Sequence, residues 1–230
     1  MSDQNTTGQS AADQPWAEPG WLSPEQFEAA AGVEDWRLLG DGIYAFFRTT
    51  FADGARLVQA IAESAGIDAD RPPDIDLRHD GVTVRLTTIT VGQYFAGYSP
   101  DDVELARRIS GVARQAGAPA DPGNLQHVQV SIDAMEIGEV MPFWREALGY
   151  RFRRDTEEDV VDPHGRGPSF WFQQMDAPRT QRNRIHVDIA VPAEQLEARV
   201  AAVLAAGGRR LYPERPSVLS DPEGNEICLV

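Results

Sequence analysis

Three segments between residues 70 and 106 decide the fold of the first half of the chain. They are Asp70-Arg71-Pro72-Pro73-Asp74-Ile75-Asp76-Leu77, Val82-Thr83-Val84-Arg85-Leu86-Thr87-Thr88-Ile89 and Ser99-Pro100-Asp101-Asp102-Val103-Glu104-Leu105-Ala106. Apolar and polar residues alternate along the second segment, which predicts a strand with one buried face. Asp80-Gly81 is a hairpin turn signal, so Ile75–Arg78 is expected to pair with Val82–Thr88. Ser99-Pro100 begins a helix, with Ser as its cap and Pro in the first turn.

The preceding residues complete an αββαββα pattern. Ser23-Pro24-Glu25-Gln26 has the form of a helix start with a capping box. Strand-like runs are Trp36–Leu39 and Ile43–Thr49, and Phe51–Ala65 predicts a helix with Leu57, Val58, Ile61 and Ala62 on one face. Residues 1–20 are polar and are expected to form a disordered tail. The first domain is therefore predicted at 21–116, and the Ala-, Pro- and Gly-rich segment 117–124 as a linker.

In the remainder, 125–230, the element order of strand, helix and three strands occurs twice. The expected elements are Leu125–Ile132, Glu136–Leu148, Tyr150–Arg153, Val160–Asp162 and Ser169–Gln173, then Ile185–Val191, a helix from Pro192 to Ala206, Arg209–Tyr212, Ser217–Leu219 and Glu226–Val230. The predicted fold class is thus a two-domain α+β/α/β chain, an αββαββα domain followed by paired βαβββ modules.

Composition excludes several classes of function. The formal net charge is −15, which repels nucleic acid phosphates and anionic membrane surfaces. No apolar run approaches the roughly 20 residues that a membrane span needs, and the polar N-terminus does not resemble a secretory signal. The single cysteine, Cys228, excludes an internal disulfide framework. We therefore expect a cytoplasmic protein whose partner is a small molecule, with neither nucleic acid nor membrane.

The three segments quoted above resemble the pterin-4a-carbinolamine dehydratase family. That family has a His-His-Pro sequence before the first hairpin strand and a Thr-His after the second. Its histidines correspond to Arg71, Pro72 and Ile89 in this chain. The family dehydrates a 4a-hydroxytetrahydrobiopterin, which requires groups that give and take protons near neutral pH. Arg stays protonated, and Pro and Ile do not titrate, so residual lyase activity of this kind is disfavoured.

Two interpretations of this first domain remain open. In one, the pocket is re-purposed: Arg71 binds an anion or carbonyl, Asp102 retains a catalytic role, and Tyr94, Phe95 and Tyr98 stack on a pterin-like or other flat heterocycle. In the other, the domain is degenerate and retained for packing or dimerisation.

From Leu125 onward the chain resembles the glyoxalase/bleomycin-resistance group, the vicinal-oxygen-chelate (VOC) superfamily. The matching pieces are His127-Val128-Gln129-Val130, Phe143-Trp144, Leu148-Gly149-Tyr150, Asn183-Arg184-Ile185-His186-Val187-Asp188 and Asp221-Pro222-Glu223-Gly224-Asn225-Glu226. The resemblance implies a possible metal set of His127 and His186 with Glu226 or Cys228, suited to Zn, Fe or Mn. Alternatively, both histidines pack in the sheet and the site has no metal.

Without a metal, the sheet is still expected to bind a small molecule. Trp171, Phe172 and Trp144 are candidates to line that site, with Arg182 or Arg184 at its mouth, although Trp144 shares a helix face with core residues. The first hypothesis is therefore a small-molecule-binding protein or re-purposed enzyme that combines both domains. The alternatives are a VOC-type lyase or isomerase with catalytic His127 and His186, and a residual dehydratase. Both families commonly self-associate, which implies a homo-oligomer.

Overall fold

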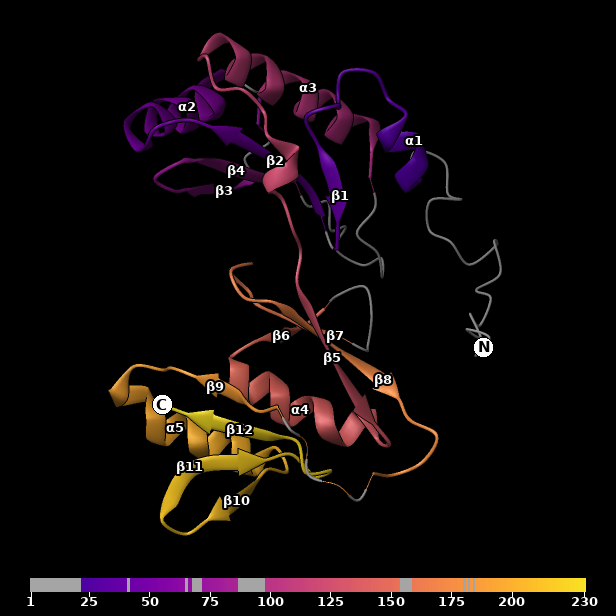
Figure 1. Cartoon of the computed structure of the whole chain (residues 1–230), viewed down its shortest axis with the longest axis vertical. Coiled ribbons are helices and arrows are strands. Elements are labelled where there is room, and N and C mark those ends of the chain that lie inside the picture. Colours follow the sequence, from indigo (N-terminus) through magenta and orange to yellow (C-terminus); the bar gives the residue numbers. More distant parts are fainter. Residues whose placement is uncertain are drawn as a thin grey trace. The chain divides into compact units, whose positions relative to one another are not determined.

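The computed structural model describes residues 22–40, 42–64, 66–67, 72–86, 98–153, 159–179, 181, 183 and 185–230. The chain divides into two compact units, Met1–His127 and Val128–Val230. Each unit is drawn in Figure 1 and is described below by itself. Within the described residues, none of the helices has the length and apolar character needed to cross a membrane.

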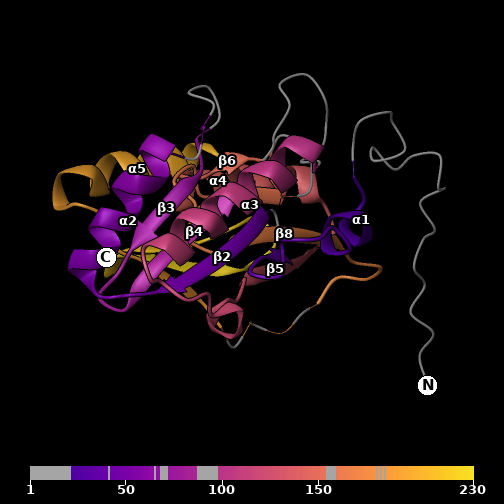
Figure 2. The same cartoon turned by 90° about the horizontal axis from the view of Figure 1, so that it is seen from above.

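The first unit has the predicted αββαββα order. Its elements are α1 (Pro24–Glu28), β1 (Arg37–Leu39), β2 (Gly42–Arg48), α2 (Phe51–Ser64), β3 (Asp74–Leu77), β4 (Gly81–Leu86) and α3 (Pro100–Gln115). The strands form an antiparallel sheet in the order β1-β2-β4-β3. In Figures 1 and 2, α2 and α3 lie on the same face of this sheet.

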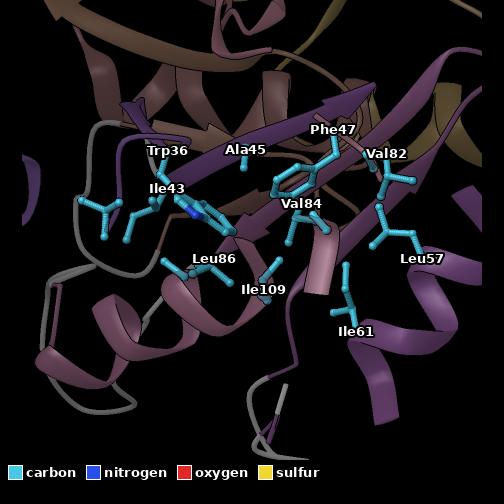
Figure 3. Close-up of a cluster of buried hydrophobic side chains, with 14 of the residues drawn as sticks. Trp36, Ile43, Ala45, Phe47, Leu57, Ile61, Val82, Val84, Leu86 and Ile109 are labelled. Carbon is cyan, nitrogen blue, oxygen red and sulfur yellow. The ribbon is translucent and has the colours of Figure 1, made fainter. Parts of the chain in front are cut away.

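The core of the first unit lies between that sheet and those helices. Figure 3 shows side chains from β2 and β4 facing Leu57 and Ile61 of α2 and Ile109 of α3. Val82, Val84 and Leu86 are buried, as their alternation predicts. Leu57 and Ile61 are fully buried, but Ala62, which was expected on the same helix face, is exposed. A helix advances 100° per residue, so Ala62 turns away from the side that Ile61 presents to the sheet.

Local sequence sets both predicted helix starts. Ser23 and Ser99 each accept a hydrogen bond from the third helical residue, and the side chains of Gln26 and Asp102 accept one from the capping residue in return. These reciprocal bonds satisfy backbone N–H groups that a helix start otherwise leaves unpaired.

The segment 117–124, expected as a linker, packs against the first unit. Ala118 is buried, Arg48 N donates to Pro119 O at 2.9 Å, and Asp121 N donates to Phe46 O at 2.8 Å. The short 3-10 helix η3 (Pro122–Asn124) follows. The segment lies beside the end of β2 that β1 leaves uncovered, because β1 pairs only with Gly42–Tyr44. Its backbone therefore satisfies hydrogen-bonding groups of an otherwise open strand.

The second unit consists of two βαβββ modules, as predicted. The first contains β5 (Gln129–Ala134), α4 (Ile137–Leu148), β6 (Arg151–Phe152), β7 (Asp159–Val161) and β8 (Ser169–Gln174). The second contains β9 (Val187–Ile189), α5 (Ala193–Ala205), β10 (Arg209–Tyr212), β11 (Arg215–Ser220) and β12 (Glu226–Leu229). The sheets have corresponding orders, β5-β8-β7-β6 and β9-β12-β11-β10, and the first and last strands of each module pair in parallel.

The register of the parallel pairs shows that the modules are an internal repeat. Gln129 lies opposite Ser169, and Asp188 lies opposite Cys228. Gln129 and Asp188 are 59 residues apart, and so are Ser169 and Cys228. His127 and His186 have the same separation, as do the Asp-Pro-x-Gly turns that begin at Asp162 and Asp221. Positions 59 residues apart can therefore be compared directly on the paired strands.

The helices of the two modules share one core. It contains Ile132, Ala134, Val140, Met141, Phe143, Trp144, Ala147, Val160, Phe170, Phe172, Val200, Val203, Leu219, Ile227 and Leu229. Trp144 is 2% exposed, which confirms the expectation that it belongs to the core. Phe172 is fully buried in the same core, so it is unavailable to line a ligand site as the sequence analysis suggested.

Candidate functional site

The face of sheet β5-β8-β7-β6 that points away from α4 is here called the open face. Along β5, Ile132 and Ala134 enter the core with α4, so the alternate residues face the other way. Along β8, Phe170 and Phe172 are buried, whereas Trp171 between them is half-buried. The open face comprises Gln129, Ser131 and Asp133 of β5, Asp159 of β7, and Ser169, Trp171 and Gln173 of β8.

Trp171 is the central aromatic residue of the open face. Ser131 of β5 lies directly opposite it on one side, and Asp159 of β7 on the other. Residues paired in this way have their Cβ atoms about 5 Å apart, so all three side chains rise from one row of the sheet. An indole ring among polar side chains can stack on a planar ligand while its neighbours form hydrogen bonds to the ligand's edge.

A polar network lies beside Trp171. Asp159 is only 4% exposed, and its carboxylate accepts from Arg153 Nη1 at 3.3 Å and from Gln129 Nε2 at 3.5 Å. Arg153 N also donates to Asp159 O at 3.0 Å. The Gln129 side chain crosses over β8 to reach β7, which accounts for the burial of Ser169, its partner on β8. A buried carboxylate held between two donors fixes the position of both.

The internal repeat shows that this arrangement is confined to the first module. Trp171 corresponds to Val230, which is 59 residues later and adjoins β12. Gln129 corresponds to Asp188, and Ser169 to Cys228. The second module therefore has neither an aromatic residue nor a carboxamide at these positions.

The second module places acidic and sulfur-containing groups on its corresponding face. His186 Nε2 lies 3.3 Å from Asp188 Oδ1, and both side chains are more than half exposed. Cys228 lies opposite Asp188 on β12, and Glu226 is two residues before Cys228 on the same face but buried. His186, Asp188, Glu226 and Cys228 thus share one face, as the sequence analysis expected for three of them.

His127 lies apart from that group. It precedes β5, whose first residue is Gln129, and it falls within the first unit. A Cβ atom added to Gly40 would be 2.5 Å from the His127 ring, so the imidazole lies directly on this glycine. Gly40 has a φ of +57°, and it follows β1.

The predicted metal ligands do not fit a metal centre in this arrangement. Among the described residues, which include all four candidates, no group of three His, Cys, Asp or Glu side chains could hold a metal ion. His127 packs on Gly40, and the Nε2 atom of His186 faces Asp188. A first-row metal site needs at least three convergent donors, so no step is assigned to a metal here.

Most candidates in the first unit lie outside the described residues. These are Arg71, Ile89, Tyr94 and Phe95, and in the second unit Arg182 and Arg184. Pro72 is described and exposed. Tyr98 packs on the first core, with its ring 6.0 Å from that of Phe27. Asp102 is buried and accepts from both N and Oγ of Ser99, so in this structure it caps α3.

Sequence reasoning identified Trp171 but missed the network beside it. Gln129 belongs to the quoted strand, yet the sequence analysis did not assign it a role. Asp159 immediately precedes the predicted strand Val160–Asp162 and was likewise overlooked. One available signal was an acidic residue next to a short apolar strand, because such a carboxylate is buried only when donors reach it.

Comparison with known proteins agrees with this division into units. The family model described as "Pterin 4 alpha carbinolamine dehydratase" matches residues 21–112. A protein of Nocardia farcinica (strain IFM 10152), whose name proposes a pterin-4-alpha-carbinolamine dehydratase, is 37% identical over 95 residues. That match covers 40% of this chain and 95% of the relative. The chain belongs to the pterin-4a-carbinolamine dehydratase family. The family model described as "Glyoxalase-like domain" matches residues 129–230, so the second unit is a glyoxalase-like domain.

Solved structures similar to this chain are glyoxalase-like proteins. One is the fosfomycin resistance protein FosX from Mesorhizobium loti, with 11% identity and a TM-score of 0.35, covering 46% of this chain and 89% of that one. Another is a glyoxalase/bleomycin resistance protein/dioxygenase family enzyme from Burkholderia phytofirmans PsJN, with 17% identity and a TM-score of 0.35. It covers 44% of this chain and 94% of its own.

Proposed function

We propose that this protein is a small-molecule-binding protein whose ligand stacks on Trp171 at the open face of the second unit. The observation that carries the proposal is the position of Trp171. It is half-buried between Ser131 and Asp159, on a side of the sheet where its neighbours in sequence, Phe170 and Phe172, do not lie. An aromatic residue with a polar surround and no place in the core is the usual form of a stacking platform.

The internal repeat adds support for a specialised role. If Trp171 served only the fold, the corresponding strand of the second module would need a similar side chain. That strand has Val230 instead, and its module still folds around Leu219, Ile227 and Leu229. The fold therefore does not require an indole at this position.

The enzymatic alternatives have less support. Acid–base dehydration needs titratable groups where the family has histidines, and the residues there are Arg71, Pro72 and Ile89. A metal-dependent VOC enzyme would need His127 and His186 to converge with a third ligand, and the described residues contain no such group. The first unit is accordingly proposed as a degenerate dehydratase domain, with ligand binding assigned to the second.

The proposal can be tested by fluorine NMR of the full chain containing 5-fluorotryptophan. The chain has five tryptophans, and a Trp171→Val variant assigns the Trp171 resonance while imitating the second module. A library of flat monocyclic and bicyclic aromatic compounds is expected to contain binders that shift this resonance and lose affinity in Trp171→Val. Phe152→Val is the matched control, because Phe152 is an exposed aromatic on the α4 side, where Arg145 stacks on it. Binders that leave the Trp171 resonance unchanged throughout the library would refute the proposal.

A further inference from the structure

The orientation of the Gln129 carboxamide can be deduced from its partner. Asp159 is buried, and its carboxylate accepts a hydrogen bond from Gln129 Nε2 at 3.5 Å. An ionised carboxylate can only accept, and Arg153 Nη1 at 3.3 Å stabilises the charged form. The amide nitrogen of Gln129 must therefore face Asp159. The amide oxygen, an acceptor, is then the other end of the carboxamide.

The remaining groups of the open face are also mainly acceptors. Asp133 contributes a carboxylate, whose charge is partly balanced by Arg179 at 3.0 Å. Ser131 can donate or accept, and it lies directly opposite Trp171. The chain as a whole has a formal net charge of −15, so the long-range potential also disfavours anions.

We infer that the open face selects flat heterocycles that carry N–H donors and are neutral or cationic, with the Gln129 amide oxygen accepting from the ring edge and Asp159 fixing its orientation. This inference rests on the proposed stacking at Trp171. It assigns Gln129 as a contact to the ligand and Asp159 as a positioning residue.

The selection can be measured with three planar bicyclic probes and the full chain containing 5-fluorotryptophan. 2-Aminobenzimidazole carries several N–H donors, quinoxaline has acceptors but no N–H, and 2-naphthoate is an anion. The dissociation constant of each probe is taken from its effect on the Trp171 resonance. Because one hydrogen bond is at stake, we expect 2-aminobenzimidazole to bind about 3- to 10-fold more tightly than quinoxaline. 2-Naphthoate is expected to bind most weakly.

Two variants test the residues. Gln129→Leu removes the acceptor at an exposed position, so the preference for 2-aminobenzimidazole over quinoxaline should fall close to 1. Asp159→Asn replaces an obligate acceptor by a group that can also donate, which allows the Gln129 carboxamide to turn over. Quinoxaline should then gain affinity relative to 2-aminobenzimidazole. Gln129→Leu provides the test even if Asp159→Asn fails to fold without its buried charge.

The outcomes separate this inference from the proposed function. If quinoxaline or 2-naphthoate binds at Trp171 as tightly as 2-aminobenzimidazole, the ligand class is wrong while the stacking site stands. An unchanged preference in Gln129→Leu removes Gln129 as the acceptor. If the probes bind the chain without any change at Trp171, both proposals fail.

Discussion

Trp144 Nε1 donates a hydrogen bond to Asp221 Oδ2 at 3.0 Å and thereby joins the two modules of the second unit. Trp144 belongs to α4 of the first module, and Asp221 begins the Asp-Pro-x-Gly turn of the second. Asp221 is fully buried, and Asn225 and Glu223 supply its other donors from the turn. Glu223 in turn accepts from Met135 N and Glu136 N at the start of α4. The turn conserved between the modules is therefore structural here, as its Asp carboxylate organises a loop and an interface.

Replacing Trp144 by Phe should destabilise the second unit. The change keeps most of the aromatic volume but removes one donor from a buried carboxylate, which costs about 1–3 kcal/mol. Hydrogen exchange measured by mass spectrometry in increasing urea reports the loss unit by unit. Trp36→Phe is the matched control, because Trp36 Nε1 donates to Ser110 Oγ at 3.0 Å inside the first unit. Its effect should appear in residues 22–127 instead. Equal protection of both units in Trp144→Phe and the unmodified chain would contradict this role.

Gly40 should tolerate alanine less well than another glycine with similar backbone geometry. Gly40 (φ +57°) and Gly117 (φ +71°) both have left-handed conformations, where a side chain costs about 1–2 kcal/mol. A Cβ atom at Gly40 would also meet the His127 ring, whereas nothing lies within 4 Å of one at Gly117. We expect Gly40→Ala to cost more unfolding free energy than Gly117→Ala.

The excess at Gly40 can be traced to the imidazole. Combining Gly40→Ala with His127→Ala should reduce the cost to that of Gly117→Ala, as measured by urea denaturation. If the double variant is no more stable than Gly40→Ala alone, His127 does not rest on this glycine as the structure indicates.

The adjacent residues Trp171 and Phe172 should respond oppositely to truncation. Phe172 is fully buried in the core, so Phe172→Ala should cost about 3–5 kcal/mol of stability. Trp171 is half-buried on the open face, so Trp171→Ala should cost about 1 kcal/mol or less while abolishing ligand binding. Thermal unfolding and the probe titrations give the two readouts. Comparable destabilisation by both substitutions would mean that Trp171 is a core residue.

The sequence predicted those features of the fold that depend on neighbouring residues. The caps at Ser23 and Ser99 and the alternation of Val82, Val84 and Leu86 are local patterns, and the structure has each of them. In Ser169–Gln174, by contrast, three consecutive aromatic residues fit a core on either face. Periodicity alone could not decide that Phe172 is buried and that Trp171 faces outward.

Long-range contacts account for what the sequence could not show about the candidate site. Gln129 and Asp159 are separated by 30 residues and meet only because β8 lies between their strands. His127 was expected on the first strand of the second domain, but β5 begins two residues later and the imidazole packs on Gly40. Such pairings depend on how strands are ordered in a sheet, which local residue patterns do not specify.

Tyr150 and Asp162 provide a test by titration. Burial, together with the negative charge of Asp162, raises the pKa of Tyr150 to about 12. Burial also acts to raise the pKa of Asp162, but the N–H groups of His164, Gly167 and Arg166 bind its carboxylate and hold its pKa below the usual value. Asp162 therefore stays charged at alkaline pH. Asp162→Asn should lower the pKa of Tyr150 from about 12, although burial keeps it above the ordinary value of 10.0.

The consequence for stability follows from the direction of that pKa change. A tyrosine whose pKa is raised by folding contributes its stability fully below pH 10, and the contribution is lost as the pH rises toward 12. In Asp162→Asn the loss should be complete at a lower pH. Tyrosinate absorbance, with Tyr150→Phe subtracted, measures the pKa, and urea denaturation between pH 9 and 12 measures the stability. Asp188→Asn is the control, since that carboxylate does not affect the pKa of Tyr150 and should leave both curves unchanged. An identical Tyr150 titration in Asp162→Asn would show that burial alone raises its pKa.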